Sequence, residues 1–196
     1  MKLDMEFYRR RDVVKISREL LGKVLVTSLG GTTTSGIIVE TEAYSWQEKG
    51  SHAFGSKLTP RTSAMFREGG HTYVYLCYGM HHLFNIVTNR EGVAEAVLVR
   101  ALEPLGGIPE MMRRRGEKVK LNHLTSGPGK LTKSMGIDRS FNGKLLSDGE
   151  IWIEDRKNVP ASQVEAGRRI GIDYAGEDAL LPWRFIIRGN QWVSRA

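Results

Sequence analysis

The sequence predicts an α+β fold built on a mostly antiparallel sheet. Three observations favour this class. Short apolar runs recur along the 196 residues, glycine-rich turns connect several of them, and helical periodicity is confined to a few short segments. No linker divides the chain cleanly, so we expect a single domain over residues 1–196.

The first expected element is a helix that follows Asp12, a residue type that caps helix N-termini. Val13, Ile16 and Leu20 recur at the spacing of one helix face, and Gly22 is expected to end the helix. Strands and tight turns follow. The expected strands cover residues 23–29, 36–44, 71–78, 83–88 and 94–102, with turns at residues 30–31, 69–70 and 89–92.

A long polar loop over residues 45–63 separates the second and third strands. Ordered loops of this length in compact domains usually serve function. The second half of the chain is less regular. There we expect helices over residues 109–115 and after the SGPGKL of residues 126–131, a strand over 151–154, a flexible stretch over 155–169, and closing strands in RRIGID and PWRFIIRG.

The chain carries 29 basic against 22 acidic residues, a net charge of +7. Such an excess is typical of nucleic-acid-binding proteins, although acidic metabolites, a membrane surface or solubility alone would also account for it. No apolar run reaches the length of a membrane span. The charged N-terminus is unlike a signal peptide, so we expect a cytoplasmic protein.

Cysteine and histidine usage bears on disulfides and metals. The single cysteine, Cys77, cannot form an internal disulfide, and its apolar neighbours predict a buried thiol. The five histidines show neither the HExxH motif nor another paired metal-ligand spacing. We therefore expect no metal site.

The stretch IIVETEAYS, residues 37–45, places two carboxylates in an apolar strand. Alternation puts Glu40, Glu42 and Tyr44 on one face. One interpretation is a half-exposed strand whose polar face meets solvent. The other is a carboxylate in a cleft that acts as general base on water, with an aromatic platform beside it and His52 nearby. Alternation alone does not choose between the two glutamates.

Three tyrosines gather in TYVYLCYGMHHLFN, which begins at residue 72. Tyr73 and Tyr75 share one face of the expected strand, and Tyr78 lies on the other. Packing within a strand buried on both faces would explain them. The Gly-Met-His-His that follows instead favours a turn with exposed large side chains, suited to stacking on bases or wedging into a duplex.

Two cationic residues are candidates for binding an anion. Arg100 lies among apolar residues in AVLVRALEP, where a structural ion pair and a phosphate or substrate contact are both open. Lys130 belongs to SGPGKL, whose backbone N–H groups could hold a phosphate, although a plain turn explains the motif equally well. SGPGKL lacks the spacing of a Walker motif.

Taken together, these motifs resemble the alkyladenine (3-methyladenine) DNA glycosylase family, and a bacterial member in particular. The resemblance runs in family order from residue 19 to residue 194. It rests on LLGKVLV, SGIIVETEAY, TPRTSAMF, YVYLCYGMHHLFNIVT, VLVRALEP, SGPGKL, MGID, RIGID-AGE, PWRF and GN-WVS. It implies a curved sheet with surrounding helices and a protruding, DNA-intercalating β-hairpin.

The resemblance implies roles for five residues around a purine flipped out of the duplex. Glu42 is the general base that activates water at the sugar C1′. Arg100 binds the neighbouring phosphate and helps to place that water. Tyr44 and His52 sandwich the base, and Asn85 lies at the pocket floor, where it would clash with the 2-amino group of guanine.

The resemblance also implies contacts with the duplex. Tyr75 is the wedge that enters the minor groove, and Tyr78 and Met80 lie at the hairpin tip. We expect Lys130 to be a further DNA contact. Residues 45–51 depart from the family because they lack its usual G-x-x-D spacing, which bears on the placement of the histidine that follows.

The implied function is that of a base-excision-repair DNA glycosylase. Its substrates would be alkylated purines (3-methyladenine, 7-methylguanine) and, by extension, deaminated (hypoxanthine) or etheno purines in double-stranded DNA. Hydrolysis of the N-glycosidic bond would leave an abasic site without strand cleavage, through an oxocarbenium-like sugar. No metal or organic cofactor is implied, no membrane is involved, and a monomer is expected.

Two alternatives from other classes remain. One is a non-catalytic nucleic-acid-binding module that uses the basic face and the tyrosine hairpin. The other is an RNA-binding accessory domain, suggested by fold-level similarity to domains of formyltransferases. A pure binder has no need of Glu42 beside DNA phosphates, because a carboxylate there repels them.

Overall fold

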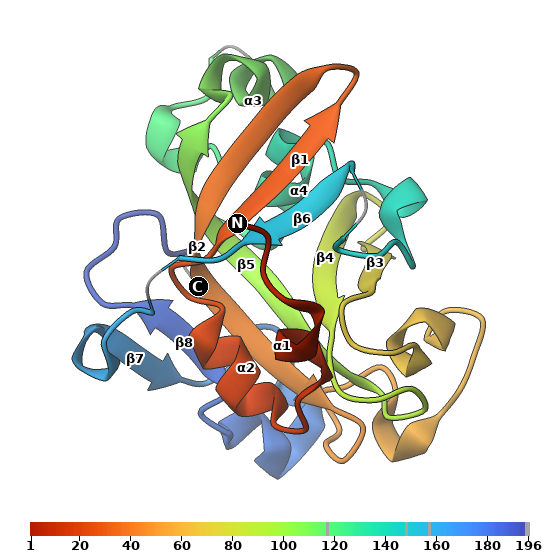
Figure 1. Cartoon of the computed structure of the whole chain (residues 1–196). Helices are drawn as coiled ribbons and strands as arrows, with labels where there is room; N and C mark the ends of the chain where they lie inside the picture. Colours follow the sequence, from red (N-terminus) through yellow and green to blue (C-terminus); the bar gives the residue numbers. More distant parts are fainter. Residues whose placement is uncertain (117, 148, 157, 195–196) are drawn as a thin grey trace.

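The computed structural model describes residues 1–116, 118–147, 149–156 and 158–194, and this part of the chain folds around one antiparallel sheet (Figure 1). Its strands are β1 (Val24–Leu29), β2 (Thr32–Ser45), β3 (Thr72–Cys77), β4 (His81–Val87), β5 (Glu95–Gly106), β6 (Ile151–Glu154), β7 (Val164–Gly167) and β8 (Arg184–Ile187). Six run in the order β3-β4-β5-β2-β1-β6, while β8 pairs with β2 and β7. The predicted α+β class is confirmed.

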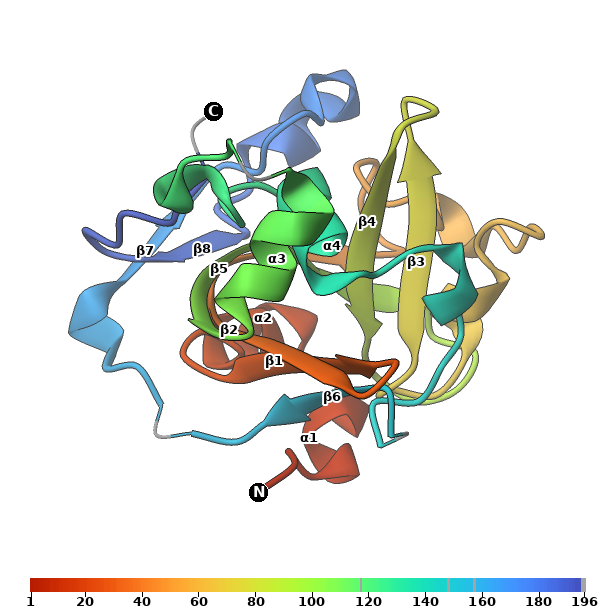
Figure 2. The same ribbon diagram turned by 90° about the horizontal axis from the view of Figure 1, so that it is seen from above.

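Short helices surround the sheet (Figure 2). The α-helices are α1 (Met5–Arg9), α2 (Val13–Glu19), α3 (Ile108–Arg115) and α4 (Pro128–Met135). The 3-10 helices are η1 (Phe54–Ser56), η2 (Ser63–Phe66), η3 (Leu121–His123), η4 (Arg139–Phe141), η5 (Ala161–Gln163) and η6 (Asp173–Leu180). The Asp12 carboxylate caps α2 as expected, because it accepts a hydrogen bond from the Lys15 backbone N–H at 2.8 Å.

The longest strand, β2, lies in the middle of the sheet. It pairs with β5 along one edge and with β1 and then β8 along the other. Every residue from 38 to 43 is buried, and the side chains of Glu40 and Glu42 are 0% exposed. The half-exposed strand is therefore excluded. The register against β5 shifts between Ile38 and Thr41, an irregularity of the kind that re-aims side chains.

Strands β3 and β4 form a hairpin at one end of the sheet, and its turn projects from the body in Figure 2. The turn is made by residues 78–80. Tyr78 (φ 50°) and Gly79 (φ 70°) both adopt left-handed backbone, which ends β3 one residue earlier than expected. Consequently, the Tyr78 side chain leaves the strand and points to solvent, with 87% of the residue exposed.

Four local expectations were wrong. The stretch over residues 155–169 contains strand β7, an edge strand that pairs with β8. RRIGID is not a strand: Gly171 has φ 79°, and Arg169 turns into a buried ion pair. Cys77 is only partly buried, because it ends the projecting β3 and lines a pocket. The second strand also begins at Thr32 rather than at Gly36.

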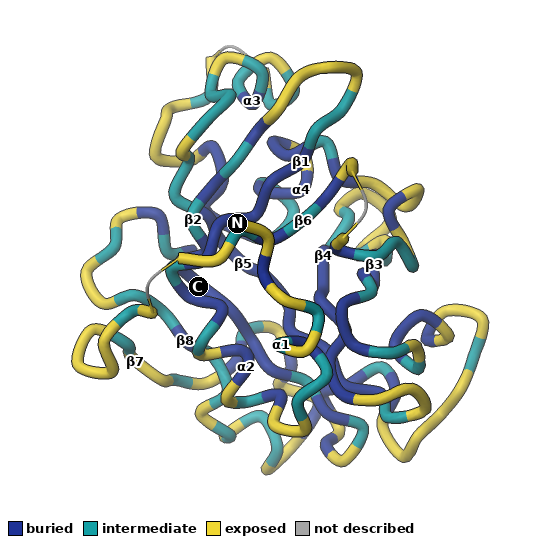
Figure 3. The backbone as a smooth tube through the Cα atoms, viewed as in Figure 1, coloured by how far each residue is buried: buried dark blue, intermediate teal, exposed yellow. Residues whose placement is uncertain are grey.

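Two apolar clusters stabilise the molecule, and Figure 3 shows the buried segments running through the sheet. The larger lies between the sheet, α2 and α4. The smaller contains Ala53, Met65 and Tyr73, and it anchors the loop that follows β2. In the described ranges, none of the helices combines the length and apolar character needed to cross a bilayer.

Candidate active site

A row of four directly paired residues crosses the sheet, and three of them, Tyr73, Asn85 and Leu98, line a pocket. Glu42 of β2 pairs with Leu98 of β5, Leu98 with Asn85 of β4, and Asn85 with Tyr73 of β3. Directly opposed residues of antiparallel strands point to the same face, so these four side chains lie on one side of the sheet. Arg100 lies two positions from Leu98 and shares that side.

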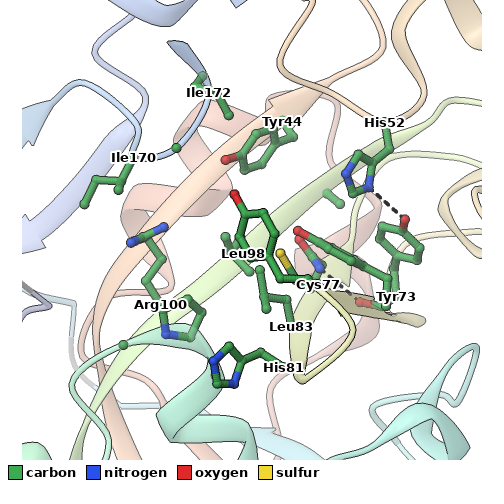
Figure 4. Close-up of a pocket in the computed structure, with 18 of the residues that line it drawn as sticks. Tyr44, His52, Tyr73, Cys77, His81, Leu83, Leu98, Arg100, Ile170 and Ile172 are labelled. Carbon is green, nitrogen blue, oxygen red and sulfur yellow. Dashed lines mark hydrogen bonds between the residues drawn. The ribbon is translucent and has the colours of Figure 1, made fainter. Parts of the chain in front are cut away.

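The pocket above this row has a volume of about 740 Å³ (Figure 4). Its walls come from β2, the loop after β2, the β3–β4 hairpin and the segment after β7. Among the predicted site residues, seven line it: Tyr44, His52, Tyr75, Tyr78, Asn85, Arg100 and Lys130. The fold therefore brings together residues that lie far apart in the sequence.

Glu42 lies behind the pocket wall rather than on its surface, because its side chain is 0% exposed. Its Oε2 accepts hydrogen bonds from Tyr44 Oη at 2.8 Å and from Arg100 Nη1 at 3.3 Å. Its Oε1 accepts one from the Ile170 backbone N–H at 2.8 Å. Burial raises the pKa of Glu42, although Arg100 and these hydrogen bonds act in the opposite direction.

Glu40 is saturated by donors and anchors the arginine between the two acids. Its Oε1 accepts from Arg100 Nε at 2.9 Å, Arg184 Nε at 2.7 Å and Ser194 Oγ at 2.9 Å. Its Oε2 accepts from the Ser194 backbone N–H at 2.7 Å. The structural ion pair considered for Arg100 is thus confirmed, and it spans both glutamates.

His52 lines the same pocket as Tyr44 (Figure 4). Its Nδ1 lies 2.9 Å from Tyr73 Oη, and its ring meets the Tyr75 ring edge to face at 4.6 Å between centroids. Burial, and then the nearby Arg61 guanidinium, lower the pKa of His52 to about 4. The imidazole is therefore neutral at physiological pH.

Two further predicted residues, Asn85 and Tyr75, lie on the β3–β4 hairpin, the first buried and the second within the pocket. Asn85 is buried, and its amide donates to the Tyr73 carbonyl oxygen at 3.1 Å, which fixes the amide plane. Tyr75, expected to be the wedge, instead lies within the pocket beside His52, with the Arg61 guanidinium 5.1 Å from its ring centroid.

The exposed apolar groups at the hairpin tip are Tyr78 and Met80. Lys130, on the first turn of α4, borders the main pocket and a second hollow of about 440 Å³ beside it. The second hollow is also lined by Met80, His82 and Lys133. Within the described ranges, no three His, Cys, Asp or Glu side chains gather in a way that could hold a metal ion.

Sequence reasoning missed three residues that build the site. Ile170 supplies the backbone donor to Glu42. Glu48 and Arg169 form a buried ion pair behind Tyr44. RRIGID offered a signal in its adjacent arginines, but nothing local indicated that Arg169 would reach a partner 121 positions earlier in the chain.

The site combines a buried carboxylate, an aromatic pocket in front of it and a projecting hairpin, on a protein of net charge +7. Sites of this kind occur in enzymes that take one base out of a nucleic-acid duplex and act on it. The family model described as methylpurine-DNA glycosylase matches residues 6–191, and the chain belongs to this family. The protein is accordingly a DNA glycosylase, a hydrolase of N-glycosyl bonds with DNA as substrate.

Curated bacterial proteins resemble the chain over its whole length. A protein of Clostridium acetobutylicum is 47% identical, covering 99% of this chain and 98% of its own length. A protein of Natranaerobius thermophilus is 44% identical over 99% of this chain and 99% of its own length. A protein of Clostridium perfringens is 43% identical over the full length of both chains. All three are described as "Putative 3-methyladenine DNA glycosylase".

Proposed function

We propose that this protein removes alkylated purines, 3-methyladenine and 7-methylguanine, together with hypoxanthine and etheno purines, from double-stranded DNA. The observation that carries the proposal is the buried Glu42 carboxylate, which accepts hydrogen bonds from Tyr44 and Arg100 at the wall of an aromatic pocket. The descriptions of the relatives support the substrate class.

The damaged base would enter the pocket after flipping and stack between Tyr44 and His52. Stacking on aromatic faces favours a cationic base through cation–π attraction. A neutral His52 is suited to this task, because a charged imidazole would repel a cationic lesion. Undamaged purines pair well and cost more free energy to flip, which adds selectivity.

In the chemical step, the N-glycosidic bond breaks and its electron pair leaves with the base. A water oxygen bonds to the sugar C1′, and the water proton passes to Glu42. The carboxylate also stabilises the positive charge that develops on the sugar. Arg100 would hold the phosphate beside the flipped nucleotide and, through its contact at 3.3 Å, keep Glu42 oriented.

Asn85 would set the purine preference at the pocket floor. Its amide plane is fixed by the hydrogen bond to the Tyr73 carbonyl oxygen, so it cannot easily rotate away from an incoming group. The 2-amino group of guanine would meet this buried amide, whereas adenine-type bases lack that group. This contact would disfavour undamaged guanine, which is also a poor leaving group. The cationic 7-methylguanine carries the same amino group, but it leaves readily and would still be excised.

The hairpin geometry favours a different wedge from the one that the resemblance suggested. Tyr75 is packed against His52, whereas Tyr78 is 87% exposed at the turn, with Met80 beside it at 70%. We therefore assign the wedge role to Tyr78 and Met80, and a pocket-wall role to Tyr75. Lys130, at the pocket border, would contact the backbone of the same duplex.

Removing the wedge should weaken binding to damaged DNA. Tyr78→Ala should lower affinity for a lesion duplex by about 1–3 kcal/mol, the range measured for base–aromatic stacking. Tyr75→Ala is the matched control, and should slow excision while leaving affinity for undamaged duplex unchanged. Fluorescence anisotropy titrations of both variants measure this. If Tyr75→Ala bound the lesion duplex more weakly than wild type and Tyr78→Ala did not, the wedge role would return to Tyr75.

The pH dependence should report Glu42 and not His52. A general base must be ionised, and burial raises the pKa of Glu42. The excision rate should therefore rise with pH, and the midpoint of that rise should lie above the usual glutamate pKa of about 4.3. His52, with a pKa of about 4, is neutral throughout and adds no limb. Single-turnover rates on a 7-methylguanine duplex measure this, because that base needs no protonation. A rate that falls with rising pH between about pH 5 and pH 7 would contradict the assignment.

The reaction should leave an abasic site and an intact strand. End-labelled duplexes with one lesion should break only after alkali treatment. Borohydride should trap no covalent complex, because water rather than an amine attacks the sugar, although Lys130 borders the pocket. Strand breaks without alkali, or a borohydride-trapped adduct that Lys130→Ala abolishes, would show an amine nucleophile and overturn the hydrolytic mechanism.

A further inference from the structure

A buried ion pair lies directly behind the Tyr44 wall. The Arg169 side chain is 0% exposed, and its Nη1 and Nη2 donate to Glu48 Oε1 at 2.7 Å and Oε2 at 2.8 Å. Its guanidinium carbon lies 4.8 Å from the Tyr44 ring centroid and 5.3 Å from that of Trp183. Tyr44 lines the pocket, whereas Arg169, Glu48 and Trp183 do not.

The arginine also binds the backbone of the residue before Tyr44 and that of η6. Nη1 donates to the Ala43 carbonyl oxygen at 3.0 Å, and Nη2 to the Asp178 carbonyl oxygen at 3.0 Å. A bidentate guanidinium that is stacked on a ring has little freedom to move. Tyr44 is therefore fixed from behind by a group that belongs to the C-terminal part of the chain.

The acid of the same pair organises the loop that leads to His52. Glu48 Oε2 accepts from the Gly50 backbone N–H at 2.7 Å, and Oε1 lies 3.4 Å from the Ser45 backbone N–H. A side chain at position 50 would meet Glu48 Oε2 at 2.8 Å, so the site needs glycine there. The ion pair thus ties together the supports of Tyr44 and His52.

Charge gives the pair a second consequence. An arginine stacked behind Tyr44 would place an uncompensated cation on the far side of the ring that receives the base. It would disfavour a cationic purine on the near side and leave a neutral purine almost unaffected. Glu48 removes this penalty, because its carboxylate contacts both terminal nitrogens of the guanidinium.

From this geometry we propose that Glu48 and Arg169 are positioning residues that fix both walls of the base clamp and, as a neutral pair, allow it to accept a cationic purine. The proposal rests on the proposed excision of damaged purines and deepens it by assigning the preference between cationic and neutral lesions. It also accounts for the loop over residues 45–51, where Glu48 supplies an acid although the loop lacks the usual family spacing.

The test compares single-turnover excision of 7-methylguanine, which is cationic, with that of hypoxanthine, which is neutral, at about pH 6.5. Glu48→Gln should slow both reactions and lower the cationic-to-neutral rate ratio by about tenfold. Arg169→Met should raise that ratio, because Glu48 is left as a net negative charge. The double variant should return the ratio to within about twofold of wild type, even where its rates are lower.

Lys23→Met is the matched control for loss of a buried cation. The Lys23 ammonium lies 2.6 Å from Asp155, and Lys23 does not line the pocket. This variant should lose thermal stability and keep the wild-type ratio. Because the two single variants shift the ratio in opposite directions, either one that folds decides the question. An unchanged ratio in a folded single variant overturns this inference alone, whereas a wild-type protein that excises neither base overturns the proposed function.

Discussion

Replacing Glu42 with glutamine should lower the single-turnover excision rate by about 10²–10⁴-fold, the contribution typical of a general base. The glutamine amide keeps the shape of the side chain and can still contact Tyr44 and Arg100, but it accepts no proton from water. Affinity for a lesion duplex should stay close to that of wild type, because Glu42 lies behind the pocket wall with 0% exposure. Anisotropy titration and rapid-quench excision measure the two quantities on the same duplex.

Glu40→Gln is the control that separates the two acids. Glu40 accepts four hydrogen bonds, two of them from Arg100 and Arg184, so its replacement should reduce thermal stability and slow excision only through misplacement of Arg100. Excision by Glu42→Gln at the wild-type rate would rule out Glu42 as the base. A larger loss in Glu40→Gln than in Glu42→Gln, at equal folding, would transfer the role to Glu40.

Replacing Arg100 with methionine should destabilise the protein by about 3–5 kcal/mol, because it leaves two buried carboxylates without their shared cation. Excision should also fail. Without the guanidinium, the pKa of Glu42 would rise further, and less of the base would be ionised at neutral pH. Urea unfolding, with excision measured well below the unfolding midpoint, separates the two effects.

The sign of the pH dependence checks this explanation of the Arg100 variant. A carboxyl whose folded-state pKa lies above its unfolded value stabilises the fold as it takes up a proton. The stability deficit of Arg100→Met relative to wild type should therefore shrink as pH falls from 7 towards the glutamate value of about 4.3. Arg100→Lys retains the positive charge but not the planar guanidinium with its paired N–H donors, and it should lose less stability than Arg100→Met. A deficit that is independent of pH would mean that the buried charges are not its cause.

The parts of the fold that were predicted correctly depend on neighbours in the sequence. The Asp12 cap, the apolar spacing of α2 and the Gly30-Gly31 turn between β1 and β2 are signals within a few residues, and the structure has all three. Alternation along β2 also placed Tyr44 over Glu42, where the tyrosine hydroxyl donates to the carboxylate. Such contacts follow from the two-residue period of a strand.

The parts that were missed depend on partners far along the chain. Strand β7 has a weak apolar pattern and exists because β8 pairs with it. The Glu48–Arg169 pair joins residues 121 positions apart, so neither position looked unusual by itself. Alternation placed Tyr73 and Tyr75 correctly on one face, and both line the pocket. The expectation for Tyr78 was wrong, because that residue lies outside β3 and its left-handed backbone, which turns the ring to solvent, has no sequence signature of its own.

The most direct test of the central claim is the identity of the molecule that leaves the DNA. Alkylated duplex DNA would be incubated with the wild-type protein, with Glu42→Gln and with no protein, and the small molecules released would be identified by mass spectrometry. We predict free 3-methyladenine and 7-methylguanine from the wild-type reaction, and the spontaneous background alone from the other two. Wild-type protein that binds the duplex fully and releases no free base above that background would contradict the account and leave a non-catalytic DNA-binding protein.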